Sequence, residues 1–473
     1  IAAGDEHGAL QLADRFGGDL AHAGRGRALV TLLKAASEDQ RSTHYRALYW
    51  AASASARMFD WEWASDALAA VERTASAQGD VLTARDALAA RAYMLNVWGR
   101  FELAAEAARQ LIASFPETEV AARAAAALGH VVPGMTGSGR FTEAVSLIRQ
   151  RVPELAAEPR AIADAEALGR AVAAVTLARD GDFAEAHAQL NLAEALVPGC
   201  EQDVVRTFVP WTRAMVGFLG GDVERAGIAA RGAEAIALDV GDLQRVLECR
   251  ALQAILKVLA GDLADAERRF RDVEELRSGI GNFWVTILTL LSRPRRSLLA
   301  GDLPGALAAA EANHALAANV GEAWFVCFSR LEVVYLRARS GDDAGALAYA
   351  RIAADEAQTL SADLLRYGAR LLLAATDADA GAAACAEALA IAERRDYRFL
   401  MPYAMHLDSL DARLWSALVS PHAARAAALL DTFSLLDVVE IATAEKLPAE
   451  EVAAVYFAVS ERIEVDRMLT RIT

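Results

Sequence analysis

Apolar residues recur at spacings of three and four along most of the chain, which is the pattern of one face of an α-helix. Before Gly261, for example, Leu252, Ile255, Leu256 and Leu259 share a face. Short breaks containing glycine interrupt the pattern at regular intervals, and no segment reads as a strand. The pattern therefore predicts an all-α protein with helices of about 15 to 18 residues and short connections.

The breaks share a six-residue pattern of Gly, Asp, an apolar residue, two variable residues and Ala. One repeat reads Gly261-Asp262-Leu263-Ala264-Asp265-Ala266. Nine versions begin at residues 18, 59, 99, 139, 181, 221, 261, 301 and 341, so that the spacing between successive repeats is nearly constant. A register kept over nine repeats indicates a repeat array with a period of about 40 residues.

Each position of the pattern has a physical role. Gly adopts the left-handed conformation that ends a helix, and Asp caps the helix that follows. Ala has a small side chain, so that the two helices of a hairpin can approach closely. We expect the capping side chains to be Asp182, Asp222, Asp262 and Asp302. A second turn, twenty residues after the first, is marked by Gly79, Gly241, Gly281 and Gly321.

The start of each hairpin, as in residues 261–266, resembles the second helix of tetratricopeptide repeats, whose usual period is about 34 residues. The longer period here indicates longer helices, and HEAT repeats, which have a similarly long period, are the alternative. The resemblance implies an all-α, right-handed superhelix of antiparallel helix hairpins. We expect it over residues 1–425, followed by a C-terminal helical segment over residues 426–473.

Long repeats of this kind also resemble the helical region of large ATP-binding LuxR-type transcription regulators. In that family the array lies between a nucleotide-binding domain and a DNA-binding helix-turn-helix, and it receives an inducer or a partner protein. The resemblance covers roughly residues 1–425 and rests on the style of the repeat. This chain contains no GxxxxGK[ST] loop and no basic C-terminal helix-turn-helix. It would then correspond to the sensor portion, with a protein or small-molecule effector as its partner.

The end of the chain has a different character. It contains Phe433-Ser434-Leu435-Leu436-Asp437 and closes with Met468-Leu469-Thr470-Arg471-Ile472-Thr473. Residues ~432–473 resemble a C-terminal helical segment of the large bacterial NAD-dependent glutamate dehydrogenases, a segment that is not catalytic in that family. The resemblance implies an alternative function, as a non-catalytic part or partner of such a dehydrogenase assembly. A pure protein scaffold is the third possibility.

Composition excludes several classes of partner. Lys and Arg number 48 and Asp and Glu number 64, a net charge of −16, which repels nucleic acid and anionic membranes. We expect no direct binding of nucleic acid, no membrane association and a cytoplasmic location. The cysteines lie far apart without a CxxC pair, which is typical of buried, reduced thiols. They are Cys200, Cys249, Cys327 and Cys385.

No catalytic pattern is visible. The eight histidines form no HExxH pair, no GxSxG occurs, and Gly137-Ser138-Gly139 precedes a hairpin rather than following a strand. We therefore expect no metal, no cofactor and no catalytic residue, and we interpret the chain as a binding protein rather than an enzyme.

Two features point to a binding surface. Trp284 and Trp324 lie one period apart, and Phe328 is in register with Phe208. All lie on the first helix of a repeat, which lines the concave face of tetratricopeptide arrays. These rings would form a stacking surface for a ligand or peptide; the alternative, which is the commoner role of such rings, is packing between repeats.

The second feature is the run Arg293-Pro294-Arg295-Arg296. Proline inside a helix removes a hydrogen bond, so we expect Pro294 to break or kink the first helix of its repeat. Three arginines at a kink would hold a carboxylate or phosphate, and the alternative is a solvated kink paired with nearby acids. The candidate binding residues are Trp284, Trp324, Phe328, Arg293, Arg295 and Arg296.

Overall fold

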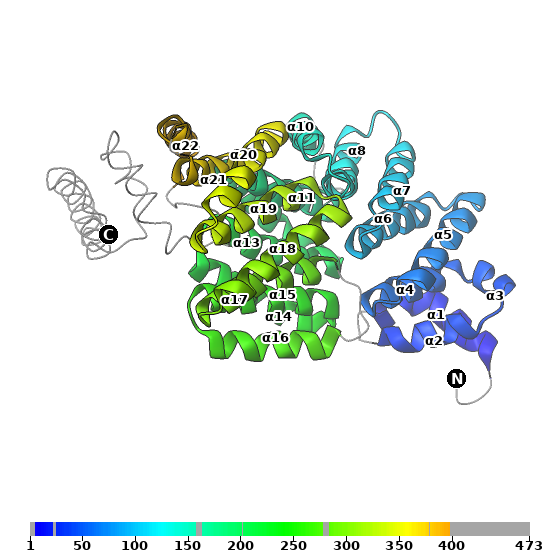
Figure 1. Cartoon of the computed structure of the whole chain (residues 1–473). Helices are drawn as coiled ribbons and strands as arrows, with labels where there is room; N and C mark the ends of the chain where they lie inside the picture. The colour runs from blue at the N-terminus through cyan, green and yellow to red at the C-terminus, as the bar shows by residue number, and fades with distance from the viewer. Residues whose placement is uncertain are drawn as a thin grey trace, which may run out of the picture. The chain divides into compact units, whose positions relative to one another are not determined.

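The computed structural model describes residues 5–21, 25–157, 163–200, 202–277, 283–377 and 379–397. Within these ranges every regular element is a helix, and no β-strand occurs (Figure 1). The all-α fold predicted from the sequence is confirmed. The expected helical segment over residues 426–473 lies outside the described residues, as do residues 398–425 at the end of the expected array.

The helices follow one another with short connections, many of only a few residues. In chain order they are α1 (Glu6–Leu20), α2 (Gly26–Ala35), α3 (Glu38–Thr43), α4 (Tyr45–Arg57), α5 (Trp61–Ala77), α6 (Val81–Trp98), α7 (Phe101–Ala113), α8 (Val120–Ala126), the π-helix η2 (Ala127–Val131), α9 (Val132–Gly137), α10 (Phe141–Arg151), η3 (Val152–Ala157), α11 (Ala163–Asp180), α12 (Phe183–Leu196), η4 (Val197–Gly199), α13 (Asp203–Leu219), α14 (Val223–Val240), α15 (Leu243–Leu259), α16 (Leu263–Arg277), α17 (Phe283–Leu299), α18 (Leu303–Val320), α19 (Ala323–Arg339), α20 (Asp343–Leu360), α21 (Asp363–Thr376) and α22 (Gly381–Arg395).

The chain divides into two compact units. The first compact unit takes its residues from Ile1–Leu177, Ala184–Gly217 and Asp222–Leu290. The second compact unit takes its residues from Ala178–Phe183, Phe218–Gly221 and Leu291–Thr473. The turns at Gly181 and Gly221 therefore belong to the second compact unit, although the helices that follow them, α12 and α14, belong to the first.

The predicted turns are present from residue 59 onward. The glycines that begin seven repeats have left-handed backbones, with φ between 75° and 96°: Gly99, Gly139, Gly181, Gly221, Gly261, Gly301 and Gly341. The second turns at Gly79, Gly241 and Gly321 have φ between 72° and 79°, whereas Gly281 lies outside the described residues. Phe59 and Ser361 occupy glycine positions of the same register with φ of 67° and 55°. The register thus persists even where glycine is absent.

The turn expected near residue 18 is wrong. Helix α1 has a kink at Phe16, whose backbone is non-helical with φ of −124° and ψ of 16°, but it runs on through Gly17 and Gly18 and ends at Leu20. A Cβ atom on Gly17 would lie 2.8 Å from Cδ1 of Trp50, and one on Gly18 would lie 3.0 Å from the same indole. These glycines therefore let α1 pack closely against α4, a use of glycine that resembles a turn in the sequence alone.

The aspartates of the turns cap the next helix. Asp222 accepts a hydrogen bond from the backbone N–H of Arg225 at 3.0 Å, and Asp302 accepts one from Gly305 at 2.9 Å. Asp262 does the same with the N–H of Asp265 at 3.3 Å. The capping prediction is confirmed for these three, while the Asp182 carboxylate lies 2.9 Å from Nη1 of Arg395.

The two helices of a repeat differ sharply in burial. In α15 thirteen of 17 residues are buried, and in α19 twelve of 17. In α14 only four of 18 residues are buried, and all four are alanines: Ala226, Ala230, Ala233 and Ala237. The first helices α15 and α19 are therefore enclosed on most of their circumference, whereas the second helix α14 presents a narrow alanine stripe inward and the rest of its surface outward.

The sixth-position alanine is the innermost residue of each hairpin. Its exposed fraction is 0% in all eight repeats from residue 59 onward: Ala64, Ala104, Ala144, Ala186, Ala226, Ala266, Ala306 and Ala346. At one hairpin, a Cβ atom built on Gly217 would lie 3.3 Å from Cβ of Ala226. Helix pairs this close leave no room for a larger side chain, because core packing is near crystalline density.

Prolines inside first helices do not end them. Helix α17 runs from Phe283 to Leu299 with Pro294 inside it, and α13 likewise contains Pro210. The expectation that Pro294 breaks its helix is therefore wrong, and the expected kink stays a prediction. The missing hydrogen bond costs less than the loss of the buried helix, which tertiary packing stabilises as a whole.

Two glycines of α14 provide a test of the turn assignment. Gly241 ends the helix with φ of 72°, Gly232 lies inside it, and neither has a heavy atom within 4 Å of its Cβ position. Gly241→Ala should lower the free energy of unfolding by roughly 1 kcal/mol, the cost of a left-handed alanine. Gly232→Ala should raise it by about 0.5–1 kcal/mol, since alanine favours the helix.

Urea unfolding followed by circular dichroism measures both changes. Neither substitution introduces a steric contact. Changes of opposite sign in the free energy of unfolding would therefore report the backbone conformation at each glycine. A shift of the same sign in both variants would contradict the assignment of Gly241 to a left-handed turn.

Candidate binding sites

Trp324 and Phe328, two of the predicted stacking residues, are buried in the second compact unit. Their exposed fractions are 1% and 2%, and their rings are stacked with centroids 5.0 Å apart. The indole Nε1 of Trp324 donates a hydrogen bond to the backbone oxygen of Arg179 at 2.9 Å. Rings this enclosed cannot stack against a ligand unless the core opens, so the structure accords with the packing alternative.

An internal ion pair covers these rings. The Arg179 guanidinium lies 4.7 Å from the centroid of the Trp324 ring, and its Nη2 lies 2.6 Å from Oε1 of Glu322. The other oxygen of Glu322 caps α19 by accepting a hydrogen bond from the N–H of Phe325 at 2.7 Å. Burial raises the pKa of Glu322, although Arg179 opposes that effect. The turn around Gly181 is thereby fastened to α19.

The first compact unit contains a similar arrangement. Arg245, with an exposed fraction of 1%, pairs with Glu248 and donates from Nη2 to the hydroxyl of Tyr93 at 2.8 Å. Its guanidinium lies 5.0 Å from the Phe208 ring and 4.7 Å from the Trp211 ring. A buried arginine that lies on an aromatic ring therefore stabilises the core of each compact unit.

The predicted arginine cluster does not form one surface. Arg293 is exposed, Arg296 is half-buried and Arg295 has an exposed fraction of 8%. Successive helical residues point about 100° apart, so Arg295 faces away from the other two. Trp284 lies in α17, but its side chain is outside the described part of the chain. No single anion site involving all three arginines follows from this placement.

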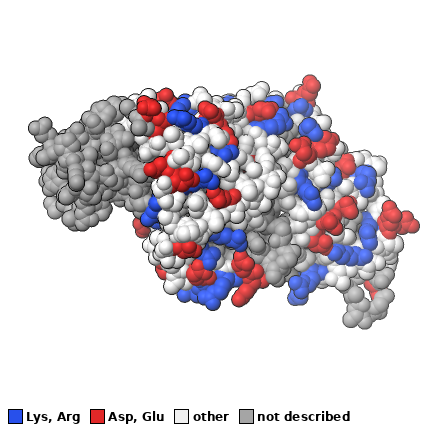
Figure 2. Space-filling model, in the orientation of Figure 1, with Lys and Arg blue, Asp and Glu red and all other residues white. Residues whose placement is uncertain are grey.

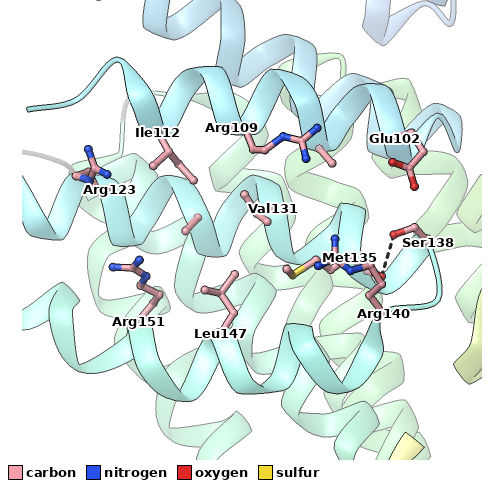
Figure 3. Close-up of a pocket in the computed structure, with 12 residues that line it drawn as sticks. Glu102, Arg109, Ile112, Arg123, Val131, Met135, Ser138, Arg140, Leu147 and Arg151 are labelled. Atoms are coloured by element: carbon pink, nitrogen blue, oxygen red, sulfur yellow. Dashed lines mark hydrogen bonds between the residues drawn. The ribbon is translucent and has the colours of Figure 1, made fainter. Parts of the chain in front are cut away.

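A pocket that the sequence did not reveal lies in the first compact unit. It has a volume of about 310 Å³ and lies between α7, α8, η2, α9 and α10 (Figure 3). Ile112, Val131, Met135 and Leu147 supply apolar wall. Four arginines also line it: Arg109, Arg123, Arg140 and Arg151. Arginines thus make up four of the twelve residues that line the cavity.

The arginines of the pocket differ in their partners. Arg109 pairs with Glu106 at 2.6 Å, Arg140 pairs with Glu143, and Arg151 Nη1 pairs with Glu154 at 2.7 Å. The remaining arginine, Arg123, donates from Nη1 to the backbone oxygen of Phe115 at 2.9 Å. Within the described residues it has no carboxylate partner.

One wall of the pocket is an irregular helix. Ala127 and Val131, which line the cavity, are the two ends of the π-helix η2. Inside it, His130 is buried, and burial lowers its pKa to about 4. Its backbone oxygen accepts a hydrogen bond from Nδ2 of Asn96 at 3.3 Å. Single-turn π-helices often occur at functional sites, which draws attention to this wall.

Other kinds of site find no support among the described residues. No three His, Cys, Asp or Glu side chains come together there as a metal site would require. The same residues contain no helix both long and apolar enough to cross a membrane. On the face shown in Figure 2, Lys and Arg side chains are interspersed with Asp and Glu side chains, so that face has no extended field of one sign.

One solved structure is similar over most of the chain. It is the crystal structure of a Rap protein complexed with Competence and Sporulation Factor, with a TM-score of 0.58 and 10% sequence identity. The match covers 82% of this chain and 98% of the Rap chain. At this identity the likeness concerns the fold alone, and it confirms an all-α superhelical repeat fold of the tetratricopeptide-like kind.

The end of the chain matches a sequence family. Residues 403–473 match the family described as glutamate dehydrogenase, C-terminal. The match confirms the resemblance noticed in the sequence and begins at residue 403 rather than near residue 432. It covers well under half of the chain and lies outside the described residues. No curated protein matches the chain.

Glu332 is a buried carboxyl on α19, the helix that also holds Trp324. Its exposed fraction is 4%, and no hydrogen-bond partner of Oε2 is present in the part of the chain that the structure describes. Burial raises its pKa from 4.5 to about 8. Between these values the folded chain holds a proton at this carboxyl that the unfolded chain releases, so the free energy of unfolding falls as the pH rises.

Glutamine at this position cannot ionise. We expect Glu332→Gln to raise the midpoint of thermal unfolding at pH 8, with a gain that shrinks toward pH 5 as the pH approaches the pKa of 4.5 that the wild-type carboxyl has in the unfolded chain. Glu311→Gln is the control, because the Glu311 side chain is 44% exposed. Differential scanning calorimetry from pH 5 to pH 8 measures the effect. An equal gain at every pH would show that Glu332 is ionised in the folded chain.

Proposed function

We propose that this chain is a non-catalytic, ligand- or protein-binding repeat module, the sensor or interaction region of a bacterial transcription regulator. The observation that carries the proposal is the tetratricopeptide-like repeat fold, shared with a Rap protein whose structure was solved in complex with Competence and Sporulation Factor. A repeat array of this kind has a large surface and no need of a reaction centre to hold a partner.

The chemistry of the described residues supports a binding role. The cysteines at positions 200, 249, 327 and 385 are all buried with free thiols. Burial raises the pKa of Cys200 to about 12, so it is not a thiolate nucleophile at neutral pH. Glu322 and Glu332, two carboxyls whose pKa is raised by burial, are enclosed in the core, where no substrate reaches them.

The position of a partner follows from the burial of the helices. First helices are enclosed, so the exposed faces of second helices and the pocket between α7 and α10 are the surfaces open to an effector. The net charge of −16 favours an effector that is not a nucleic acid. We place contact with DNA in another part of such a regulator.

The alternative function is a non-catalytic part or partner of a large NAD-dependent glutamate dehydrogenase assembly. The match of residues 403–473 to the C-terminal region of glutamate dehydrogenase is the observation that favours it. Under this alternative the repeats would position or stabilise the enzyme rather than sense an effector.

Two measurements on the full chain separate these functions. The purified chain should neither reduce NAD in the presence of glutamate nor hydrolyse ATP, because no Gly-rich strand-to-helix turn that could hold a dinucleotide occurs in the part of the chain that the structure describes. When mixed with a bacterial NAD-dependent glutamate dehydrogenase, it should elute separately in size-exclusion chromatography.

Stoichiometric co-elution with the dehydrogenase would favour the alternative. Turnover of either substrate, abolished by a point substitution within this chain, would remove both non-catalytic functions. A gel-shift assay with duplex DNA should show no retardation by the chain alone, and a shift that falls with added salt would contradict the assignment of DNA contact to another part of the regulator.

A further inference from the structure

We propose that the pocket between α7 and α10 binds a small amphipathic carboxylate, a monoanion with a short alkyl or other apolar body. This inference deepens the proposed sensor function and rests on it, since it names the chemical class of a small-molecule effector. It is carried by three features of the pocket: its size and apolar wall, the state of its arginines, and the irregular helix beside it.

The cavity suits a small molecule. Its volume of about 310 Å³ lies at the lower end of the range for small-molecule sites, roughly 300–1,000 Å³. Ile112, Val131 and Leu147 provide an apolar wall from three different helices. Figure 3 shows their side chains directed into the space between α7 and α10. An apolar wall of this extent favours a ligand whose body is itself apolar.

The donors for an anion lie at one end of the pocket. In Figure 3, Arg123 and Arg151 are drawn at the same end, with Leu147 and Ile112 further along the cavity. Arg123 has no carboxylate partner among the described residues, whereas Arg151 pairs with Glu154. The proposal therefore assigns the anion to the guanidinium of Arg123, since a guanidinium binds a carboxylate through two parallel hydrogen bonds.

The opposite end of the pocket is less suited to an anion. Arg109 and Arg140 each pair with a glutamate one helical turn away, and both arginines are exposed. The carboxylate of Glu102 also lines this end. Two arginines and three glutamates leave one negative charge in excess there. The anionic group of a ligand is therefore expected at Arg123, at the end of the pocket that Arg151 also lines, with its apolar body directed toward Val131 and Met135.

The number of unpaired charges selects the class of anion. One guanidinium without a carboxylate partner, Arg123, matches a single negative charge. A phosphate monoester carries about −1.5 to −2 charges at pH 7 and would leave part of that charge uncompensated. A carboxylate therefore fits the pocket better than a phosphorylated ligand.

The wall of the pocket is built to leave this space open. Ala105 and Ala127 line the cavity where larger residues would fill it. The π-helix from Ala127 to Val131 also widens the helix there by one residue per turn. A π-helix has poorer hydrogen-bond geometry than an α-helix. The presence of a π-helix at this wall is explained if a ligand occupies the space that it creates.

Isothermal titration calorimetry of the full chain with octanoate as the probe tests the proposal. We expect a dissociation constant of roughly 1 mM or tighter, which is reasonable for ten non-hydrogen atoms. Acetate, which lacks the apolar body, and 1-octanol, which lacks the charge, should each bind at least roughly tenfold more weakly. Octyl phosphate should bind more weakly than octanoate.

Two substitutions locate the site. Arg123→Gln should weaken octanoate binding by roughly tenfold, the loss of one charge-assisted contact. Ala105→Leu should weaken it by filling the cavity while keeping every charge. The matched control is Arg149→Gln, because Arg149 lies on α10 with Arg151 but is exposed and does not line the pocket. Circular dichroism and the thermal midpoint of each variant establish that it is folded.

Several outcomes overturn the proposal: no heat of binding with about 10 mM octanoate, equal binding by acetate, tighter binding of octyl phosphate, or equal loss in Arg149→Gln. Failure here is distinct from failure of the proposed function. A chain that ignores octanoate remains a candidate module for a protein partner, whereas glutamate-dependent reduction of NAD by the chain removes the module function even if octanoate binds.

Discussion

The close approach of the two helices in each hairpin is the constraint on which the rest of the structure depends. An alanine with no exposed surface sits at the same place in eight successive repeats, three residues beyond the apolar position. A left-handed residue ends one helix just before it, and in the later repeats, such as those at Gly221 and Gly301, an aspartate cap begins the next. The alanine sets the distance between the helices in every one of these hairpins, and where the cap is present it fixes where the second helix begins.

This constraint also determines where function can reside. Because second helices pack through small alanine side chains, first helices such as α15 and α19 are buried on most sides. The aromatic rings of these first helices therefore lie in the core. Buried arginines then pair with glutamates and lie on these rings, at Arg179 and again at Arg245. A buried ion pair is costly to break, because removing one partner leaves the other charge in the core. The buried aromatic rings therefore stabilise the fold, and a binding surface must lie elsewhere.

The pocket arises where the repeat is least regular. The first helix of the hairpin at Gly139 is divided into α8, η2 and α9, and the second helix, α10, spans only 11 residues. Gly181 also follows Gly139 at a longer interval than the one that separates Gly221 from Gly261. Irregular backbone in a regular array leaves space that the standard side chains do not fill. The cavity in this region of the first compact unit has room for a small ligand.

The sequence predicted what depends on local, repeated chemistry. Left-handed glycines, capping aspartates and buried alanines each act within a few residues, so their spacing alone located eight turns. The prediction of a turn at residue 18 was wrong because Gly17 and Gly18 allow a close contact with Trp50. The sequence alone does not distinguish a glycine that forms a turn from one that allows close packing. The contact of Arg179 with Trp324 joins residues 145 positions apart and has no periodic signal. Likewise the pocket depends on how α7, α8 and α10 meet, and only the lengthened interval after Gly139 hinted at it.

The enclosure of the first helices is the central claim, and the accessibility of tryptophan tests it most directly. The chain can be labelled with 5-fluorotryptophan, with Trp211→Phe and Trp324→Phe variants to assign two of its ¹⁹F resonances. A soluble paramagnetic agent should broaden the resonance of the half-buried Trp63, which lies on the second helix α5, while those of Trp211 and Trp324, with exposed fractions of 2% and 1%, stay sharp. Broadening of the Trp324 resonance to the same extent as that of Trp63 would contradict the account, because the first helices α13 and α19 would then present an open aromatic surface to solvent.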